Sequence, residues 1–400
     1  MPTPRLPLDV LRLWQRDGLR CTTVALYRRW AERFAETCAL HGHRADERLT
    51  RQHALAFAEQ YAEKHGLQFA CVRGAARSAL HAWSCALRLL GRPRPEWCPP
   101  PRPARLPRLL SDFREFRQRH RGVAPSTLRG DVSEIQDFLA WLRSRHRSPM
   151  RICIADVDAW IVEQRRTLSR RTVARRCDSL RAFLRFMHAT GRLRHDLAMS
   201  VVAPLVRTVE HPPRALAWDD VRRILRAADC SSPIGRRDHA LLLTMATYGM
   251  GAGEVLGLRL DDIDWRARTV RVMRPKTRAA TVLPLLPEVA RAIAAYVRHS
   301  RSLLAPTRAL FVSAQLPHAA LGSASAVRYV LMKYARKAGV SGPFLGSHAL
   351  RHSHACRQVD RGAHPKVLAD ILGHRRPEST SAYVRVAIER LRDLALPVPR

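Results

Sequence analysis

The sequence predicts a mainly α-helical protein with a small antiparallel β-sheet, and three observations support this prediction. Apolar residues recur at helical spacing along most of the 400 residues. Short alternating segments, typical of strands, occur between residues 261 and 285. Two proline-rich stretches, residues 91–108 and 203–216, are unsuited to helices and divide the chain. The expected order is therefore two helical blocks followed by a mixed α+β block.

The breaks set the boundaries of the expected domains. We expect a helical arm domain at 1–92, a proline-rich linker at 93–107, a second helical domain at 108–203, a linker at 204–213, and a mixed domain with a C-terminal tail at 214–400. The two helical blocks look alike at a repeat distance of about 100 residues, so the first is interpreted as a possible duplicate of the second. The alternative is that two arginine-rich bundles resemble each other by composition alone.

The third block contains the expected sheet. It opens with a buried helix over "SPIGRRDHALLLTMATYG", and "AGEVLGLRL" begins another helix. The segments "DDIDW", "TVRVMRP" and "RAATVLPL" are expected to be strands, with a tight "PKTRA" turn between the last two. A helix then begins at Pro287, because proline suits the first helical position, and the remainder is helical in pattern.

The charge of the chain is strongly unbalanced. It has 70 Lys and Arg against 34 Asp and Glu, a formal net charge of +36. A GC-rich genome would explain why only five of the basic residues are Lys, but it would not make bases twice as numerous as acids. Clustered guanidinium groups displace counterions from a phosphate backbone, so the composition indicates a nucleic-acid partner.

The cysteines and the N-terminus indicate the compartment. Nine cysteines are scattered without a C-x-x-C pair, so we expect neither a disulfide framework nor a metal, and no other cofactor. The N-terminus lacks the apolar core of a signal peptide, and no apolar run reaches 18 residues. We therefore expect a cytoplasmic, nucleoid-associated protein without a membrane partner.

The stretch "SHALRHSHACRQVDRG" carries the first candidate site residues. It is expected to be a helix with Ser347 as N-cap and Gly362 at its end. His348 and Arg351 are three residues apart and share one face near the helix N-terminus. That end of a helix presents free N–H groups and a positive dipole, so the two side chains predict an anion site.

Two more candidates follow within the next 32 residues. A short helix is predicted from Pro365 to Gly373, with His374 on the turn after it, and a further helix after Pro377 carries Tyr383. A phosphate held by Arg and His beside a tyrosine hydroxyl is suited to phosphoryl transfer to tyrosine. Attack on a DNA phosphodiester would give a phosphotyrosine and a free 5′-hydroxyl, with the transition state stabilised by positive donors and no metal.

The motifs "H-A-L-R-H", "I-L-G-H" and "T-S-A-Y" resemble the C-terminal boxes of the tyrosine recombinase (phage integrase) family. The resemblance implies that Tyr383 is the nucleophile, that Arg351 is the second catalytic arginine, and that His348 and His374 bind the phosphate and manage protons. It also implies a lysine general acid in the hairpin between the second and third strands, where Lys276 stands. Lysine can release its proton, which arginine does not easily do.

The resemblance extends more loosely to residues 108–203, which are similar to the family's helical, SAM-like core-binding domain. The two domains together would clamp double-stranded DNA, and the family implies a synaptic tetramer, with companion recombinases as possible partners. The arm domain would bind additional DNA or neighbouring protomers. The arginines expected to contact DNA are Arg129, Arg171, Arg175, Arg176, Arg181 and Arg274.

One position departs from the family pattern. The family places its first catalytic arginine in a G-x-R-x-x-E element, and this chain keeps the supporting Glu254 but has Gly251 at the arginine position. Loss of a bidentate phosphate ligand should cost several kcal/mol, or thousands-fold in rate at about 1.4 kcal/mol per decade. Three explanations are open: an engineered change that traps a DNA complex, a natural partner impaired in cleavage, or another side chain that supplies the missing charge.

The sequence therefore predicts a site-specific recombinase of the integrase or transposase type, which works through a 3′-phosphotyrosine and is impaired in cleavage by Gly251. The alternative is a non-catalytic DNA-binding or architectural partner of active recombinases. A topoisomerase-like relaxing enzyme is a weaker third interpretation. Formation of a covalent adduct separates the first hypothesis from the second.

Overall fold

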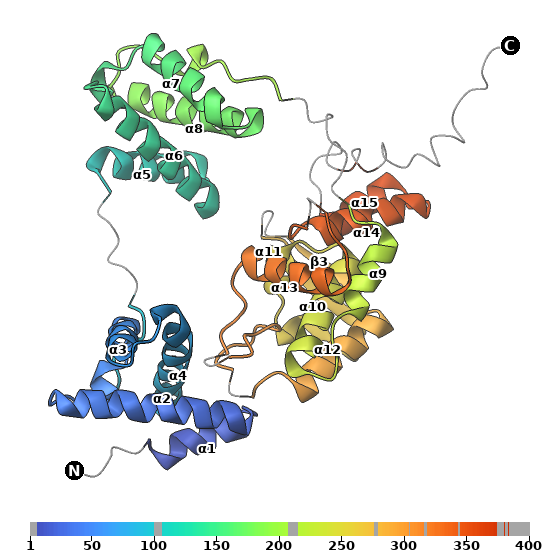
Figure 1. The fold of residues 1–400 in the computed structure, drawn as a ribbon. Coiled ribbons are helices and arrows are strands. Elements are labelled where there is room, and N and C mark those ends of the chain that lie inside the picture. Colours follow the sequence, from blue (N-terminus) through green and yellow to red (C-terminus); the bar gives the residue numbers. More distant parts are fainter. Residues whose placement is uncertain are drawn as a thin grey trace. The chain divides into compact units, whose positions relative to one another are not determined.

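The structure is a computed structural model (Figure 1). Two compact units are present: the first combines Met1–Pro99 with Pro212–Arg400, and the second is Pro100–His211. Within the described ranges no helix has both the length and the apolar character needed to cross a membrane. The described residues are 6–99, 106–206, 215–275, 279–303, 305–315, 318–342, 345–373, 380 and 383.

The N-terminal helices enclose an aromatic core. Trp30, Phe34 and Phe57 pack edge to face, with ring centroids 5.3 to 6.2 Å apart. The indole of Trp14 is fully buried and donates a hydrogen bond to the carbonyl of Ala82, which fixes the first helix on the fourth. The elements are α1 (Leu8–Arg16), α2 (Cys21–Leu40), η1 (Asp46–Arg48), α3 (Arg51–Lys64) and α4 (Phe69–Leu89).

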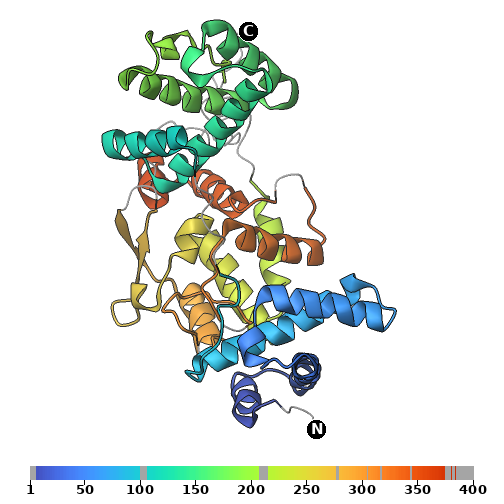
Figure 2. The ribbon, with the colours of Figure 1, turned by 90° about the vertical axis from the view of Figure 1, so that its left-hand side faces the viewer.

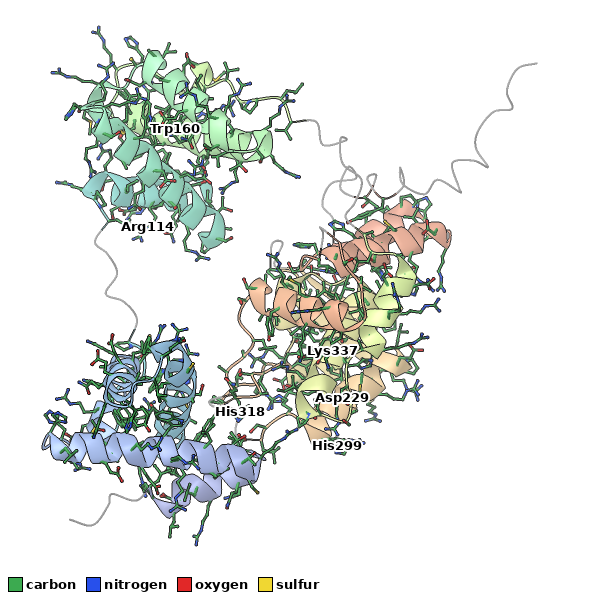
Figure 3. All side chains as sticks on the ribbon, viewed as in Figure 1. Arg114, Trp160, Asp229, His299, His318 and Lys337 are labelled. Carbon is green, nitrogen blue, oxygen red and sulfur yellow. The ribbon has the colours of Figure 1, made fainter. Side chains whose placement is uncertain are left out.

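The second unit is a helical bundle with its own core around Trp160, which lies among the helices (Figure 3) and is 1% exposed. Its helices α6, α7 and α8 have nearly the same lengths as the N-terminal helices α2, α3 and α4, in the same order. Helices α2 and α6 have 20 residues each, α3 and α7 have 14 each, and α4 and α8 have 21 and 20. This order fits a duplicated module, which stays a prediction. The elements are α5 (Arg108–Arg121), α6 (Pro125–Ser144), η2 (Pro149–Arg151), α7 (Ile154–Thr167), α8 (Arg170–Ala189) and η3 (Leu197–Ser200).

The C-terminal region combines helices with one antiparallel sheet in the order β1-β2-β3. Val270 and Leu283 are paired across β2 and β3 and point into the helical core, whereas Arg271 and Val282 on the other face are exposed. The strands lie at the margin of the helices (Figure 2), as expected of a sheet with one buried face. The elements are α9 (Trp218–Arg226), α10 (Pro233–Tyr248), α11 (Ala252–Leu256), η4 (Leu260–Asp262), β1 (Ile263–Asp264), β2 (Thr269–Met273), β3 (Ala280–Pro284), α12 (Pro287–His299), α13 (Ala324–Lys337), α14 (Ala349–Asp360) and α15 (Pro365–Leu372).

The predicted mixture of helices and a small antiparallel sheet is confirmed, and so are the helix starts at Pro287 and Pro365. The predicted cap at Ser347 is wrong, because α14 begins at Ala349 with His348 at the N-cap position. The amide of Ala349 is bonded to the carbonyl of residue 346, so a turn occupies 346–349 and delays the helix by one residue.

Candidate active site

Arg351 is held in the first turn of α14 by three acceptors. Its Nη1 donates to Glu254 Oε2 at 2.9 Å and to the carbonyl of Gly249 at 3.1 Å, and its Nη2 donates to the carbonyl of Leu372. The side chain is 12% exposed, and burial lowers its pKa, an effect that Glu254 opposes. The guanidinium is thus locked in one orientation at the meeting point of α10, α11 and α15.

The sharp turn after α10 depends on glycine. Gly249 has φ 62°, in the left-handed region that glycine adopts at little cost. A Cβ there would lie 2.7 Å from side-chain atoms of both His354 and Leu372, too close for any real contact. The turn therefore needs glycine for its conformation and for its close packing, and it aims the Gly249 carbonyl at Arg351.

Tyr383 lies in the same cluster, although most residues around it in sequence are outside the described part of the chain. Its hydroxyl is 2.9 Å from Nδ1 of His352, and its side chain is 4% exposed among apolar residues of α14 and α15. Burial raises the pKa of Tyr383, while the charge of Arg351 opposes the rise. A buried neutral phenol next to an imidazole can give up its proton to that imidazole as it becomes a nucleophile.

His352 is a functional candidate that sequence reasoning did not assign. It follows Arg351 directly and is four residues from His348 on α14, and the centroids of the two imidazole rings are 6.3 Å apart. The spacing i, i+4 places both rings on one helix face. That spacing in "H-A-L-R-H" was the available signal, but a tyrosine 31 residues away cannot be paired with a histidine from spacing alone.

Gly251 is the N-cap of α11, and Glu254 folds back on it. Glu254 Oε2 accepts a hydrogen bond of 2.8 Å from the Gly251 amide, the reciprocal half of a capping box. A Cβ at position 251 would have ordinary contacts only, the nearest being Glu254 Oε2 and His348 Cε1 at 3.7 Å and Arg351 Nη1 at 4.0 Å. The missing side chain would thus start beside the other predicted phosphate-site residues.

Arg274 lies within this cluster and is 3% exposed. Its Nη1 is 2.8 Å from Glu254 Oε1, and its Nη2 donates to the carbonyl of Ile371. The last two carbonyls of α15 therefore accept hydrogen bonds from the two guanidinium groups: Ile371 accepts from Arg274, and Leu372 accepts from Arg351. Carbonyls at a helix C-terminus carry partial negative charge and attract cations. Lys276 and His374, the other two predicted site residues, lie outside the described residues.

Replacing Glu254 by Gln should lower the free energy of unfolding of the C-terminal region by about 3 kcal/mol, since it leaves two mostly buried guanidinium groups without a carboxylate. Hydrogen exchange of core amides in α10, measured on the full chain, reports this loss. The matched control is Glu288→Gln on the exposed first turn of α12, which should change stability by less than about 1 kcal/mol. Equal protection of α10 in both variants would contradict the shared role of Glu254.

Comparison with known proteins agrees with this geometry. Residues 214–390 match the phage integrase family, and residues 110–191 match the N-terminal SAM-like domain of phage integrases. The chain is 38% identical over 296 residues to y4rF of Sinorhizobium fredii (strain NBRC 101917 / NGR234), which carries the name integrase/recombinase; the match covers 73% of this chain and 69% of that protein. The chain belongs to the phage integrase family of tyrosine recombinases.

Other relatives of this recombinase agree. Tyrosine recombinase XerD of Lacticaseibacillus casei is 26% identical, over 71% of this chain and 95% of that protein. The solved XerH recombinase on its palindromic difH substrate superposes with a TM-score of 0.58 at 16% identity, covering 71% of this chain and 83% of that one. The lambda integrase (75-356) dimer on a COC′ core site gives 0.54 at 18% identity, covering 69% and 94%. These two structures share the fold.

The predicted DNA-contacting arginines of the second unit differ in availability. Arg129 and Arg171 are exposed and form no ion pair with any described carboxylate, whereas Arg175 is exposed but paired with Glu134. Arg176 and Arg181 are largely occupied within the module. Arg176 bonds Gln164 and Asp137, and Arg181 bonds Asp178 and the carbonyl of Val201. Of these five arginines, Arg129 and Arg171 are therefore the most available to bind a phosphate.

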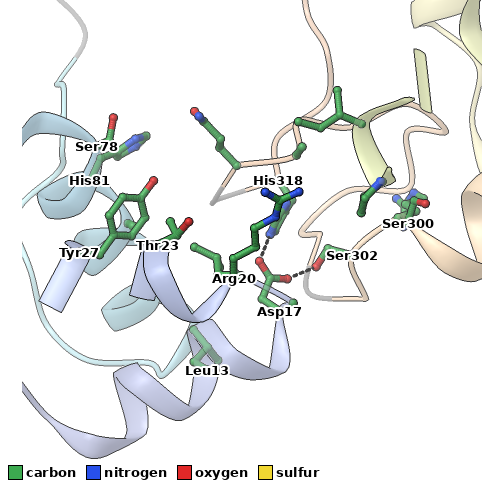
Figure 4. Close-up of a pocket in the computed structure, with 18 of the residues that line it drawn as sticks. Leu13, Asp17, Arg20, Thr23, Tyr27, Ser78, His81, Ser300, Ser302 and His318 are labelled. Carbon is green, nitrogen blue, oxygen red and sulfur yellow. Dashed lines mark hydrogen bonds and ion pairs between the residues drawn. The ribbon is translucent and has the colours of Figure 1, made fainter. Parts of the chain in front are cut away.

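Within the first unit, a cavity of about 1020 Å³ is lined by the N-terminal helices and by residues of the region that matches the phage integrase family. Figure 4 shows Tyr27 and His81 on one side and Ser300 on the other. Asp17 and His318 both line this cavity. Asp17 accepts one hydrogen bond from Ser302 and bonds His318 Nε2, and the side chains of Asp17 and His318 are 2% and 3% exposed. Asp17 lies outside both family matches, and His318 lies inside the region that matches the phage integrase family, so this pair joins the two regions.

The Asp17–His318 contact should weaken as the pH rises. Burial lowers the pKa of His318 and Arg301 adds to this, but the hydrogen bonds to Asp17 and to the carbonyl of Ser313 outweigh them, so the pKa is raised above 6.5. A raised folded-state pKa gives stability that is complete below the unfolded value and is lost as pH rises through the folded value.

The variant His318→Asn tests this expectation, because asparagine tolerates the positive φ of 53° at this position. Urea unfolding of both chains should show a stability difference at about pH 6 that shrinks as the pH increases. A difference that stays constant across this pH series would mean that His318 acts without its charge.

Proposed function

We propose that this chain is a site-specific DNA recombinase of the integrase or transposase type, with Tyr383 as the nucleophile. The observation that carries the proposal is the adjacency of Arg351 and His352 on α14. The guanidinium of Arg351 is largely buried and held by Glu254, and the next imidazole bonds the hydroxyl of Tyr383. One turn of helix therefore supports a proposal in which Arg351 is a phosphate ligand and Tyr383 is the nucleophile.

In the proposed cleavage step, Tyr383 Oη forms a bond to phosphorus and the P–O5′ bond breaks. The phenol proton passes to a base, and His352 Nδ1 at 2.9 Å is placed to accept it. The leaving 5′-oxygen takes a proton from Lys276, the role that the family resemblance implies for this residue. The bond energy is retained in the 3′-phosphotyrosine, so the reverse attack by a 5′-hydroxyl rejoins the strand without a further energy source.

The proposed partner is double-stranded DNA. The net charge of +36 and the exposed Arg129 and Arg171 support binding to a phosphate backbone. Among proteins that share this fold, lambda integrase is seen as a dimer on a core site and as a tetramer on a Holliday junction. We propose a synaptic tetramer for this chain too, with companion recombinases as further partners.

Cleavage by this chain is proposed to be slowed by Gly251, which provides no guanidinium where the family pattern has one. The alternative function, a non-catalytic DNA-binding partner of active recombinases, is favoured by the same glycine. The two functions differ in one product, a covalent link between Tyr383 and a DNA 3′-phosphate.

The test uses duplexes that the protein itself selects from a random-sequence pool, rebuilt with nicks at successive positions so that cleavage releases a short fragment and traps the adduct. Denaturing gels should show a protein–DNA band that protease digestion removes. If neither the chain nor its Gly251→Arg variant gives a band on DNA that both bind, the recombinase proposal fails and the architectural role replaces it.

A further inference from the structure

We propose that Arg274 binds the scissile phosphate and supplies the guanidinium that position 251 lacks. The inference rests on the proposed recombinase function and concerns the same site. Two buried positive charges support it. The guanidinium groups of Arg274 and Arg351 both contact Glu254, and the side chains of the three are 4%, 12% and 13% exposed. Two cations thus share one carboxylate in a site that is largely removed from water.

The described residues do not balance this charge. Glu254 is the only described carboxylate within 4 Å of either guanidinium. A buried charge is costly unless it is paired, so the arrangement calls for one further anion. A phosphodiester carries one negative charge. The formal charges of two guanidinium groups, one carboxylate and one phosphodiester sum to zero.

Arg274 also has donors to offer to such an anion. Its Nη2 is used by the carbonyl of Ile371, but Nε and Nη1 are buried and have no aligned hydrogen-bond acceptor among the described residues. The contact of Nη1 with Glu254 Oε1 is an ion pair at 2.8 Å that lacks the alignment of a hydrogen bond. Nε and Nη1 lie on different edges of the planar guanidinium group, because Nη1 is on the same side as Cδ, so each would donate one separate hydrogen bond to a phosphate oxygen.

Arg274 shares the carboxylate of Glu254 with position 251, where the family pattern has its first arginine. The carboxylate of Glu254 bonds the amide of Gly251 through Oε2 and contacts Arg274 through Oε1. On the other side Gly373 ends α15, and a Cβ there would lie 3.0 Å from Arg274 Nε. A larger residue at 373 would crowd the guanidinium. Arg274 therefore reaches the carboxylate next to position 251 from the residue after β2 instead of from the N-cap of α11.

The consequence is that Gly251 slows cleavage without abolishing it, because Arg274 carries part of the phosphate contact. Removing Arg274 by Arg274→Met leaves Glu254 and Arg351 as a balanced pair, so the domain should still fold. We expect adduct formation on the nicked duplexes to fall about 100-fold with DNA affinity unchanged. Arg274→Lys keeps the charge but replaces the separate Nε and Nη1 donors by one ammonium group, and the rate of adduct formation should fall by about tenfold.

Two readouts separate phosphate binding from a structural role. In the Gly251→Arg background, Arg274→Met should cost less than about tenfold, because the introduced guanidinium shares the contact. A duplex with a neutral methylphosphonate at the scissile position should also reduce the effect of Arg274→Met, since less charge develops there. If Arg274 had only a structural role, Arg274→Met would lower the rate of adduct formation by the same factor in both backgrounds and on both substrates. The matched control is Arg271→Met, which removes an exposed β2 arginine paired with Asp262 and should leave the rate unchanged.

The outcomes distinguish the two proposals. Adducts from the Gly251→Arg variant together with none from the unmodified chain would overturn the role of Arg274 and leave the recombinase function standing. Adducts from the unmodified chain that are insensitive to Arg274→Met would do the same. If Arg274→Met does not fold, the Arg274→Lys variant decides: equal rates for it and the unmodified chain would overturn the inference. Absence of adducts from every variant on bound DNA would reject the recombinase function itself, and the inference with it.

Discussion

Replacing Tyr383 by Phe should abolish the covalent adduct, a loss of at least about 10⁴-fold in its rate of formation. The ring of Tyr383 packs against the apolar cluster of Ala355, Val359, Leu368 and Leu372, and phenylalanine keeps those contacts. The change removes the hydroxyl, including its bond to His352, and the loss of that bond should cost about 1 kcal/mol of stability. A folded, DNA-binding chain without adduct is therefore the expected result.

The measurement is adduct yield against time on nicked duplexes, alongside DNA affinity by gel shift and thermal unfolding. The matched control is Tyr329→Phe, because Tyr329 is 71% exposed on α13 and lies outside the site. This control should behave as the unmodified chain does. A persistent adduct in Tyr383→Phe, mapped to another residue by peptide mass, would assign the nucleophile elsewhere.

The framework of the site was predictable because its signals are local. Pro365 and Gly373 bound α15 as expected, since proline suits a helix start and glycine adopts the left-handed φ of 67° at its end. The two strands of the hairpin, β2 and β3, were predicted from the alternation of apolar residues. The predicted cap at Ser347 failed by one residue because hydrogen bonding in the preceding turn, and not residue type, decides where α14 begins.

The contacts that give the site its chemistry were not predictable in the same way. Arg274 stands in the segment "RPKT", which is typical of an exposed turn, and is one of the arginines expected from the sequence to contact DNA. Its burial depends on a carbonyl 97 residues further along the chain, at Ile371, and on a carboxylate in α11. The pairing of His352 with Tyr383 likewise requires α14 to be packed in place. Such contacts come from tertiary packing, which no local pattern encodes.

Restoring an arginine by Gly251→Arg should raise the rate of adduct formation about 100-fold. The backbone at 251 has φ −74° and ψ 161°, which any residue adopts, and a Cβ there meets no atom closer than 3.7 Å. The new guanidinium would start beside His348 and Arg351, at the predicted phosphate site. The gain falls short of the thousands-fold expected for a whole missing ligand if Arg274 already carries part of that contact.

The same change should destabilise the chain when DNA is absent. A third guanidinium would enter a site where Glu254 already neutralises only one of two, and like charges repel strongly where water is scarce. Gly251→Met, of similar length but neutral, is the matched control and should change neither the rate nor the salt dependence of stability. Faster cleavage together with lower stability that salt or bound DNA restores would identify Gly251 as the position where a phosphate ligand is missing. A rate equal to that of Gly251→Met would instead mean that the existing pair of arginines already meets the full requirement of the phosphate.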